Sequence, residues 1–477
     1  MRPLSQPSGA ADGLAREARR AMGDRFGGAI VGPAHADYDT ARRVWNGMID
    51  RYPALIVRCA ETADVAAAVR FAVDRGLPVA VRGGGHNVAG NATCDNGLVI
   101  DLSPMKRITV DREARIARAE PGLTWREFDA AAAQAGLATT GGLVSSTGIA
   151  GFTLGGGIGW LMRRYGLTCD NLLSAELVTV DGEPVTASER TNADLFWGLR
   201  GGGGNFGIVT EFSYRLHPVT SVFGGLVLHE ASRAAEVLAF FRGFVAAAPD
   251  KLTALAAFLT APPAPFVPAE LQGKPAVALV VCYAGDLAEG EQIVAPLRRF
   301  GPPRADVIGP LPYPALQQMF DASAPAGLRN YWKSGYLRAL DDGALETIVA
   351  HATQAPSPLT QVHVHQMGGA VGRVAPDATA FVHRRAPFVL NIVGTWAEPA
   401  ADDANLMWVR DFWSAIEPAT EGVYVNFLGE EGEERVRAAY SPGVYERLVA
   451  LKDRYDSGNV LRFNQNVRPS RGAAPSA

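Results

Sequence analysis

Cysteines are scarce in this sequence, and their spacing excludes two kinds of site. The chain of 477 residues has only Cys59, Cys94, Cys169 and Cys282. No two of them form a Cys-x-x-Cys pair, so neither a zinc ribbon nor a thioredoxin-type redox site is expected. Scattered cysteines without a secretion signal fit a reducing compartment, and we expect a cytoplasmic protein.

Long apolar runs and an excess of positive charge are also missing. We find no run of about 18 apolar residues and therefore expect no membrane span. The first 26 residues lack the apolar region of a signal peptide. The net charge of −4 leaves no basic surplus for nucleic acid or an anionic membrane. With 48% hydrophobic and 20% charged residues, the chain has the composition of a globular protein of two or three domains.

Glycine is abundant and unevenly distributed. The 52 glycines gather in a few runs instead of repeating, which excludes a collagen-like or low-complexity chain. The densest stretches are residues 82–87, 139–159 and 202–207. Such stretches leave backbone amides accessible to a molecule bound close by.

Local patterns predict alternating strands and helices in the first half of the chain. Thr62 and Gly76 are typical of a helix start and a helix end, and Thr124 with Glu127 forms a capping-box pattern before a helix at 125–135. Strands are expected at 54–57, 79–81, 98–100, 176–180 and 208–214, and later at 276–283, 361–367 and 388–396. We divide the chain into a polar N-terminal arm (1–45), a first domain (46–218), a second domain (219–435) and a C-terminal segment (436–477).

The segment Arg82-Gly83-Gly84-Gly85-His86-Asn87 follows a predicted strand. Three consecutive glycines let the backbone form a nest of N–H donors that suits a pyrophosphate, and Arg82 adds positive charge. A tight glycine turn that leaves a histidine on the surface explains the same residues equally well. The segment alone does not decide between these interpretations.

The segment 202–207 matches Gly-x-Gly-x-x-Gly, but its context differs from a dinucleotide-binding fingerprint. That fingerprint opens a helix, whereas residues 208–212 are typical of a strand. We therefore favour a turn that packs against a cofactor or a core strand.

Two pairs of alternating side chains are candidate site residues. His363 and His365 share one face of a predicted strand with Gln361. Because no carboxylate or cysteine cluster accompanies them, we predict no metal site and favour a polar face that lines a pocket. Tyr424 and Asn426 also alternate. The tyrosine either belongs to the core or is a catalytic base, which would require neighbours that lower its pKa.

Taken together, these segments resemble the FAD-linked oxidases of the vanillyl-alcohol-oxidase or PCMH type, and within them the berberine-bridge-enzyme-like branch. The segment 82–87 resembles the flavin-attachment motif of that family. Several further segments resemble family motifs in the right order along the chain: 148–159, 165–173, 205–209, 331–334, 365–369, 424–426 and 463–466. The resemblance covers nearly the whole chain after the N-terminal arm.

The resemblance implies an α+β fold. It consists of a split FAD-binding domain, with two α/β subdomains plus the C-terminal return, and a substrate domain with an antiparallel sheet backed by helices. His86 takes the position whose imidazole bonds to the flavin 8α-carbon. Other residues implied to contact FAD are Arg82, Gly83, Gly84, Gly85, Asn87, Thr147, Gly148, Gly151, Gly155, Gly156, Cys169, Asp170, Asn171, Gly207, Ile208, Val209, Asn426, Asn464 and Asn466.

One departure from the family concerns the number of covalent bonds. Members with two bonds carry a second attachment cysteine four residues before the glycine that matches Gly148, and this sequence has Val144 there. Cys169 lies in a different motif and is interpreted as a packed thiol near the cofactor. The resemblance therefore implies a single covalent bond, through His86, as in the branch that includes bacterial hydroxynicotine oxidases.

The implied activity is oxidation of a small organic molecule, with hydride transfer to the flavin and reoxidation by O2. For an alcohol substrate, Tyr424 would take the hydroxyl proton, assisted by His365 or Gln366. Thr147 matches the position that gates oxygen in the family, which favours an oxidase over a dehydrogenase. An amine or N-heterocycle oxidase and a non-catalytic flavin-binding protein are the alternatives. Neither the substrate nor the oligomeric state can be read from the sequence.

Overall fold

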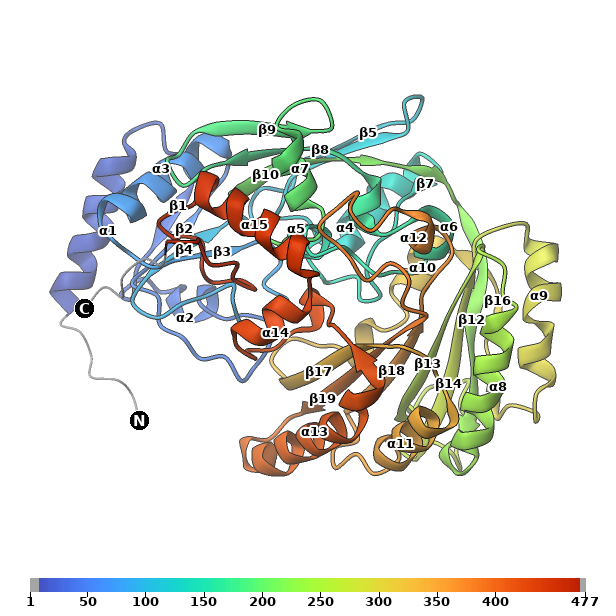
Figure 1. Cartoon of the computed structure of the whole chain (residues 1–477). Coiled ribbons are helices and arrows are strands. Elements are labelled where there is room, and N and C mark those ends of the chain that lie inside the picture. Colours follow the sequence, from blue (N-terminus) through green and yellow to red (C-terminus); the bar gives the residue numbers. More distant parts are fainter. Residues whose placement is uncertain (1–7, 472–477) are drawn as a thin grey trace.

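Four β-sheets organise residues 8–471, the part of the chain that this computed structural model describes (Figure 1). Two of them, with their helices, build an N-terminal domain, and the largest builds a second domain. The smallest pairs β7 (Leu137–Ala138) with β11 (His217–Pro218) just before the chain enters the second domain.

The first sheet has the strand order β1-β2-β4-β3, from β1 (Ala29–Val31), β2 (Leu55–Arg58), β4 (Leu98–Asp101) and β3 (Val79–Arg82). The last three strands are parallel and buried, in keeping with their uninterrupted apolar sequences. Helix α3 (Thr62–Asp74) packs on this sheet, and the chain turns at Gly76 with a φ of 62°.

The first 45 residues were predicted to form an arm, and this prediction is wrong for the residues described. Helix α1 (Ser8–Met22) packs against α3, and Ala18 and Met22 are buried in the same core. Strand β1 adds an antiparallel edge to the sheet through pairing with β2. Residues 1–7 lie outside the described part of the chain. The apolar side chains of α1 that meet this core, Leu14, Ala15, Ala18 and Met22, share one face of the helix.

The second sheet is antiparallel, in the order β5-β6-β10-β8-β9. Its strands are β5 (Ile108–Asp111), β6 (Ile116–Ala119), β8 (Leu172–Val178), β9 (Pro184–Ser188) and β10 (Ile208–Arg215), with helices α4 (Trp125–Gln134), α5 (Ile149–Leu154), α6 (Met162–Tyr165) and α7 (Ala193–Leu199). Helix α4 begins at the capping box of Thr124 and Glu127, which confirms that prediction.

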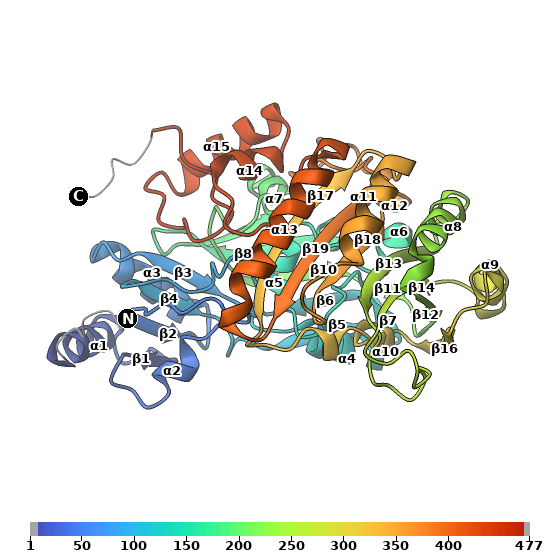
Figure 2. The ribbon, with the colours of Figure 1, turned by 90° about the horizontal axis from the view of Figure 1, so that it is seen from below.

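The second domain is built on a nine-stranded antiparallel sheet with the path β15-β12-β14-β13-β18-β19-β17-β20, and β16 pairs with β12. Helices α8 (Ala234–Ala246), α11 (Asp342–Ala352) and α13 (Asp402–Ile416) lie side by side on its outer face (Figure 2). Their apolar sides and the sheet form one core. This confirms the α+β fold with helices behind an antiparallel sheet. The strands are β12 (Ser221–Glu230), β13 (Leu252–Thr260), β14 (Pro275–Tyr283), β15 (Ala305–Asp306), β16 (Gly309–Pro312), β17 (Arg329–Leu337), β18 (Gln361–Gln366), β19 (Phe388–Trp396) and β20 (Thr420–Glu421).

After this sheet the chain returns to the N-terminal domain, where α14 (Glu433–Ala438) leads into α15 (Pro442–Tyr455) and α15 packs on α7 (Figure 1). A fully buried ion pair follows, with Lys452 Nζ 2.6 Å from Asp456 Oδ2. The same ammonium group donates to the carbonyl groups of Asn205 and Leu461, so it fixes the C-terminal turn beside the glycine segment 202–207. Within residues 8–471 no helix has the length and apolarity needed to cross a membrane.

A buried carboxyl group links the two domains. Asp129 on α4 is 3% exposed, and its Oδ2 accepts a hydrogen bond of 3.1 Å from Gln317 of α10 (Tyr313–Gln317). Burial raises the pKa of Asp129 to about 7. Asp129 Oδ1 and Gln317 Oε1 are both buried acceptors without a partner in the described chain, and a proton on the carboxyl group supplies a donor at this pair.

This pair predicts that stability falls as the pH rises. Because the folded-state pKa of Asp129 lies above the unfolded value of about 3.9, its contribution is complete below pH ~4 and is lost as the pH passes 7. We expect Asp129→Asn, which is neutral at every pH, to melt at a higher temperature than the wild type at pH 8. The gain should shrink at pH 5, as measured by calorimetry. The exposed Asp411→Asn is the control, and an Asp129→Asn gain that is equal at both pH values would contradict the linkage.

Candidate active site

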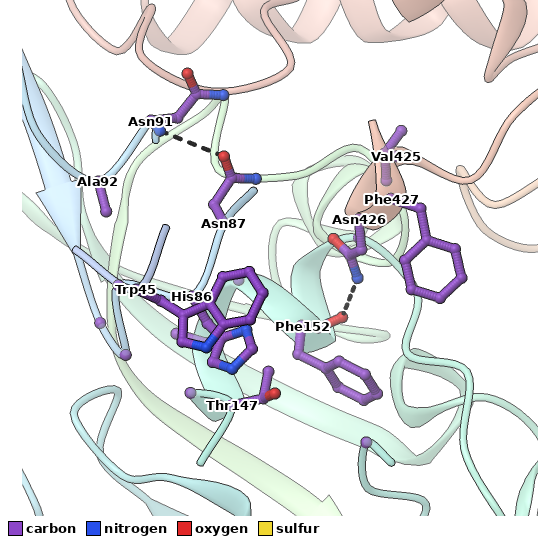
Figure 3. Close-up of a pocket in the computed structure, with 18 of the residues that line it drawn as sticks. Trp45, His86, Asn87, Asn91, Ala92, Thr147, Phe152, Val425, Asn426 and Phe427 are labelled. Atoms are coloured by element: carbon purple, nitrogen blue, oxygen red, sulfur yellow. Dashed lines mark hydrogen bonds between the residues drawn. The ribbon is translucent and has the colours of Figure 1, made fainter. Parts of the chain in front are cut away.

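A large cavity lies between the N-terminal domain and the inner face of the nine-stranded sheet (Figure 3). Its lining extends in sequence from Trp45 to Gln465. One side consists of glycine-rich loops, and the other consists of side chains from β17, β18 and β19.

The first loop follows β3 and brings Gly83, Gly84, Gly85, His86 and Asn87 to the cavity. Gly85 has a φ of 66°, a conformation that favours glycine. A Cβ atom on Gly84 would lie 2.5 Å from the backbone nitrogen of Gly148, so this loop touches the loop at 147–155 through backbone alone. The three glycines therefore serve a close approach between two loops, and the histidine that follows them faces the cavity and not the protein surface.

His86 is held by an aromatic neighbour. Its ring stacks on Trp45 with centroids 4.3 Å apart and an angle of 17° between the planes (Figure 3). Its Nε2 lies 3.5 Å from Ser146 Oγ. Burial lowers the pKa of His86 to about 4, so the imidazole is uncharged at neutral pH and one ring nitrogen keeps a free lone pair.

Trp45 also connects the two domains, a role that the sequence did not reveal. Its indole Nε1 donates to the carbonyl of Ala324 at 3.0 Å, and its backbone N–H donates to Gly85 at 3.0 Å. The N–H of Gly327 donates to the Trp45 carbonyl. Trp45 thus fixes the orientation of the His86 ring relative to the segment 324–327, which leads into β17.

Two more glycine-rich segments form the same wall. Residues Thr147, Gly148, Gly151 and Gly155 line the cavity around α5, and Gly207, Ile208 and Val209 line it at the start of β10. A Cβ atom built on Gly151 or on the neighbouring Gly204 would meet nothing within 4 Å, so open space faces both backbones. Asn464 also lines the cavity. Its amide nitrogen donates to Gly204 and Leu461, and its Oδ1 is buried with no partner in the described chain.

Several residues predicted to contact FAD do not line this cavity. Arg82 forms a buried ion pair of 2.8 Å with Asp101 and donates to the Ala41 carbonyl, so it organises the loop from behind. Gly156 and Asn466 also lie outside the lining. At Gly156 the φ of 123° and the nearby ring of Phe381 explain the need for glycine.

The segment 169–171, predicted to contact the cofactor, lies outside the cavity lining and bonds to other parts of the protein. Asp170 forms a two-pronged ion pair with the fully buried Arg384, at 2.7 and 2.8 Å. Asn171 donates to the carbonyl groups of Tyr165 and Leu167. Burial raises the pKa of the Cys169 thiol, and this residue does not reach the cavity.

At the position that the resemblance assigns to a second attachment cysteine, Val144 lines the cavity. All four cysteines of the chain are buried elsewhere. No thiol is therefore available in this cavity for a second bond.

The side chains of Tyr424 and Gln366, both predicted to be catalytic, lie outside the cavity lining. Tyr424 does not line the cavity, and its hydroxyl oxygen accepts from the N–H groups of Gly157 (2.9 Å) and Ile158 (3.3 Å). Burial raises the pKa of Tyr424, the opposite of what a base requires. Gln366 points to the opposite face of β18, where its amide bonds to Ala254 and Val245.

The inner face of the sheet does bring His365, His363 and Gln361 to the cavity. Burial lowers the pKa of His363 to about 4 and that of His365 well below its usual value, so both imidazoles are neutral. Asn426 lines the opposite side of the cavity, where its Nδ2 donates to Tyr424 Oη and to the Phe152 carbonyl (Figure 3).

Trp45, Trp332, Asn391 and Phe427 are among the lining residues that the sequence analysis missed. Trp332 lies on β17 and Asn391 on β19, and the burial along neither strand alternates, so no period-two signal marked these residues. Phe427 follows Asn426 in a short 3-10 turn, Val425–Phe427, that replaces the extended backbone we expected there. Within residues 8–471 no group of three His, Cys, Asp or Glu side chains is placed to hold a metal ion.

Comparisons with known proteins agree with this architecture. Residues 53–188 match the family model described as FAD binding domain, and residues 423–468 match the model described as berberine and berberine like. The FAD-linked oxidoreductase YgaK of Bacillus subtilis is 33% identical over 451 residues, which cover 93% of this chain and 97% of the relative.

The hydroxynicotine oxidases are similar over the same length. The (R)-6-hydroxynicotine oxidase of Paenarthrobacter nicotinovorans is 31% identical over 457 residues, covering 93% of this chain and 97% of that enzyme. A crystal structure of 6-hydroxy-D-nicotine oxidase from Arthrobacter nicotinovorans superposes with a TM-score of 0.85 at 29% identity, covering 93% of this chain and 98% of the other. The chain belongs to the FAD-linked oxidoreductases of the berberine-bridge-enzyme-like family.

Proposed function

We propose that this protein is an oxidase that binds FAD covalently through His86, oxidises a small organic alcohol and passes the electrons to O2. The observation that carries the proposal is a neutral, stacked histidine in a cavity that has glycine loops on one side and two neutral histidines on the other.

The residues that line the cavity fit FAD. The glycine loops at 83–87, 147–155 and 203–209 leave their backbone exposed, and such loops bind phosphate groups through N–H donors. The unpartnered Oδ1 of Asn464 offers an acceptor to the same molecule. When bound, the isoalloxazine ring accepts a hydride from a substrate C–H bond.

His86 would form one covalent bond to the 8α-carbon. The bond replaces an imidazole N–H and a C–H of the flavin methyl group. Both hydrogens and two electrons reach O2, which becomes hydrogen peroxide. The uncharged imidazole suits this reaction because its lone pair is not occupied by a second proton.

His365 is the residue on this chain that is best placed to receive the proton of an alcohol. It lines the cavity, it is neutral, and its Nε2 has no hydrogen-bond partner in the described chain. A nitrogen lone pair of its ring can accept the hydroxyl hydrogen as the neighbouring C–H hydrogen leaves with its electron pair. Tyr424 would stabilise the turn at Gly157 instead.

An amine oxidase is the second candidate, and one observation favours it: a relative 31% identical over nearly the whole chain is a hydroxynicotine oxidase. A neutral amine transfers hydride without a base. Dependence of turnover on His365 therefore separates the two candidates.

Covalent attachment predicts the behaviour of flavin after acid precipitation. The colour of wild-type protein should stay with the pellet and map to the peptide that contains His86. For His86→Ala the FAD should appear in the supernatant, because the proposal assigns the single covalent bond to His86. Cys169→Ala is the matched control and should keep the link, since that thiol lies outside the cavity. Release of FAD into the supernatant after acid precipitation of the wild-type protein would contradict the proposal.

Trp45 should set the speed of attachment. Trp45→Leu removes the ring that fixes the imidazole plane, so covalent incorporation into apoprotein supplied with FAD should slow by about tenfold. Trp45→Phe should restore most of the rate. Non-covalent FAD binding, followed by fluorescence, should change little. Equal attachment rates for all three proteins would show that the stacking has no such role.

Proton transfer to His365 predicts a large loss in His365→Phe and a small one in Tyr424→Phe. With the alcohol substrate we expect kcat/KM to fall by about 100-fold or more in the first variant and by less than about tenfold in the second. Because His365 is already unprotonated, the wild-type kcat/KM should be flat between roughly pH 6 and 9. A rate that climbs towards pH 10 and vanishes in Tyr424→Phe would restore the tyrosine as base.

A further inference from the structure

The cavity has an unusual electrostatic property. None of the lining side chains, all within the described residues, is Asp, Glu, Lys or Arg. Its three histidines are neutral because burial lowers the pKa of each. The phosphate groups of FAD would meet the backbone N–H donors of the glycine loops, whereas a charged group held against the inner sheet face would lose its water and find no side chain of opposite charge there.

Charged residues behind the wall neutralise one another. Asp321 pairs with Arg126 and accepts from Ser145, while Lys333 is bonded to Glu431. These pairs leave no free charge for a ligand.

Two buried polar atoms on the inner sheet face have no partner in the described chain. Asn391 on β19 is 2% exposed and His365 on β18 is 3% exposed, and the unpartnered atoms are Asn391 Oδ1 and His365 Nε2. Asn391 lies directly opposite His363 in the antiparallel pairing, two residues from His365 along β18. The neighbouring polar pair is satisfied, because Thr395 Oγ1 donates to Asn330 Oδ1 at 2.8 Å.

This part of the face offers unpartnered acceptors. The Nε2–H of His363 donates to Gln361 Oε1 at 2.8 Å, since an amide oxygen only accepts. His363 therefore presents its other ring nitrogen as a lone pair. A ligand that satisfies Asn391 Oδ1 must bring an O–H or N–H group.

Aromatic rings border these acceptors at both ends. The ring of Phe320 lies 5.8 Å from His363, and the ring of Phe427 lies 5.8 Å from His365. Trp332 lies 6.1 Å from Phe427. Rings at such separations make stacked or edge-to-face contacts with a flat ligand.

We propose that Asn391 and His365 select an uncharged aromatic substrate through a hydroxyl group on the carbon that is oxidised. This inference rests on the proposed function. The C–H hydrogen leaves with its electron pair, the O–H proton passes to His365, and a C=O bond forms. The two electrons and two protons end on O2 as hydrogen peroxide. An ammonium or carboxylate group on the same ring is disfavoured because no charged side chain lines the inner sheet face against which the ring would lie.

The first test compares four probes on the holoenzyme: 4-methoxybenzyl alcohol, 4-(hydroxymethyl)benzoate, 4-methoxybenzylamine and cyclohexylmethanol. Peroxide release gives kcat/KM, and anaerobic bleaching of the flavin gives the reductive step. We expect kcat/KM for 4-methoxybenzyl alcohol to exceed that for 4-(hydroxymethyl)benzoate by about 100-fold. It should exceed the values for 4-methoxybenzylamine and cyclohexylmethanol by about tenfold or more. Preference for a charged or aliphatic probe, or failure of the neutral aryl alcohol to react, overturns the proposal.

The second test changes the charge at one position. Asn391→Asp is isosteric and places a carboxylate in the cavity, so kcat/KM should fall about tenfold for the alcohol and rise about tenfold for the amine. Asn391→Leu keeps the cavity uncharged. It should lower kcat/KM for the alcohol without raising kcat/KM for the amine. If Asn391→Asp does not fold, Val393→Asp on the same lining face serves the same purpose. Unchanged selectivity in folded, flavin-loaded variants overturns the assignment.

The two levels of inference fail differently. Peroxide formed from a charged or aliphatic substrate by protein with flavin on His86 refutes the selection of uncharged aromatics and leaves the oxidase intact. Flavin that is absent from His86, or that no substrate bleaches, refutes the oxidase itself.

Discussion

The backbones of Gly84 and Gly148 touch with no room for a side chain on either residue, and the cavity depends on this contact. A Cβ atom on either glycine would lie about 2.5 Å from the backbone of the other. The contact joins the loop that carries His86 to the loop that carries Thr147 and opens α5. Because both loops are fixed against each other, the histidine, the exposed backbone and the start of the helix share one wall.

Trp45 extends this constraint across the domain boundary. It binds the backbone of Gly85 on one side and the carbonyl of Ala324 on the other, and its ring covers His86. The orientation of the imidazole is therefore linked to the segment leading into β17, which also carries Trp332 on the substrate side. The wall that carries His86 and the strand that carries Trp332 are therefore joined through one residue.

Local sequence patterns were sufficient to predict helices and strands. The side chains that line the cavity depend on contacts between residues far apart in the sequence. Residues 388–396 were predicted as a strand and form β19, because the segment is rich in β-branched and aromatic residues and lies between turn signals. Because neighbouring residues of a strand point to opposite faces, the sequence should also have shown that Gln366 faces away from the side of β18 that carries His365. Tyr424 could not have been assigned in this way. Its hydroxyl is occupied by amides of a loop 267 residues away, and no local pattern reveals such a partner. Asn391 gains its role only through pairing with His363 across two strands.

The cavity draws its lining from nearly the full length of the chain, from Trp45 near one end to Gln465 near the other. A nascent chain on the ribosome therefore lacks part of the wall until almost all of it has been synthesised. The C-terminal turn closes only when Lys452 and Asp456 are buried together beside Asn205. On this geometry, the proposed histidyl bond would form only after the C-terminal turn has closed, and covalently held flavin would mark the molecules that have finished folding.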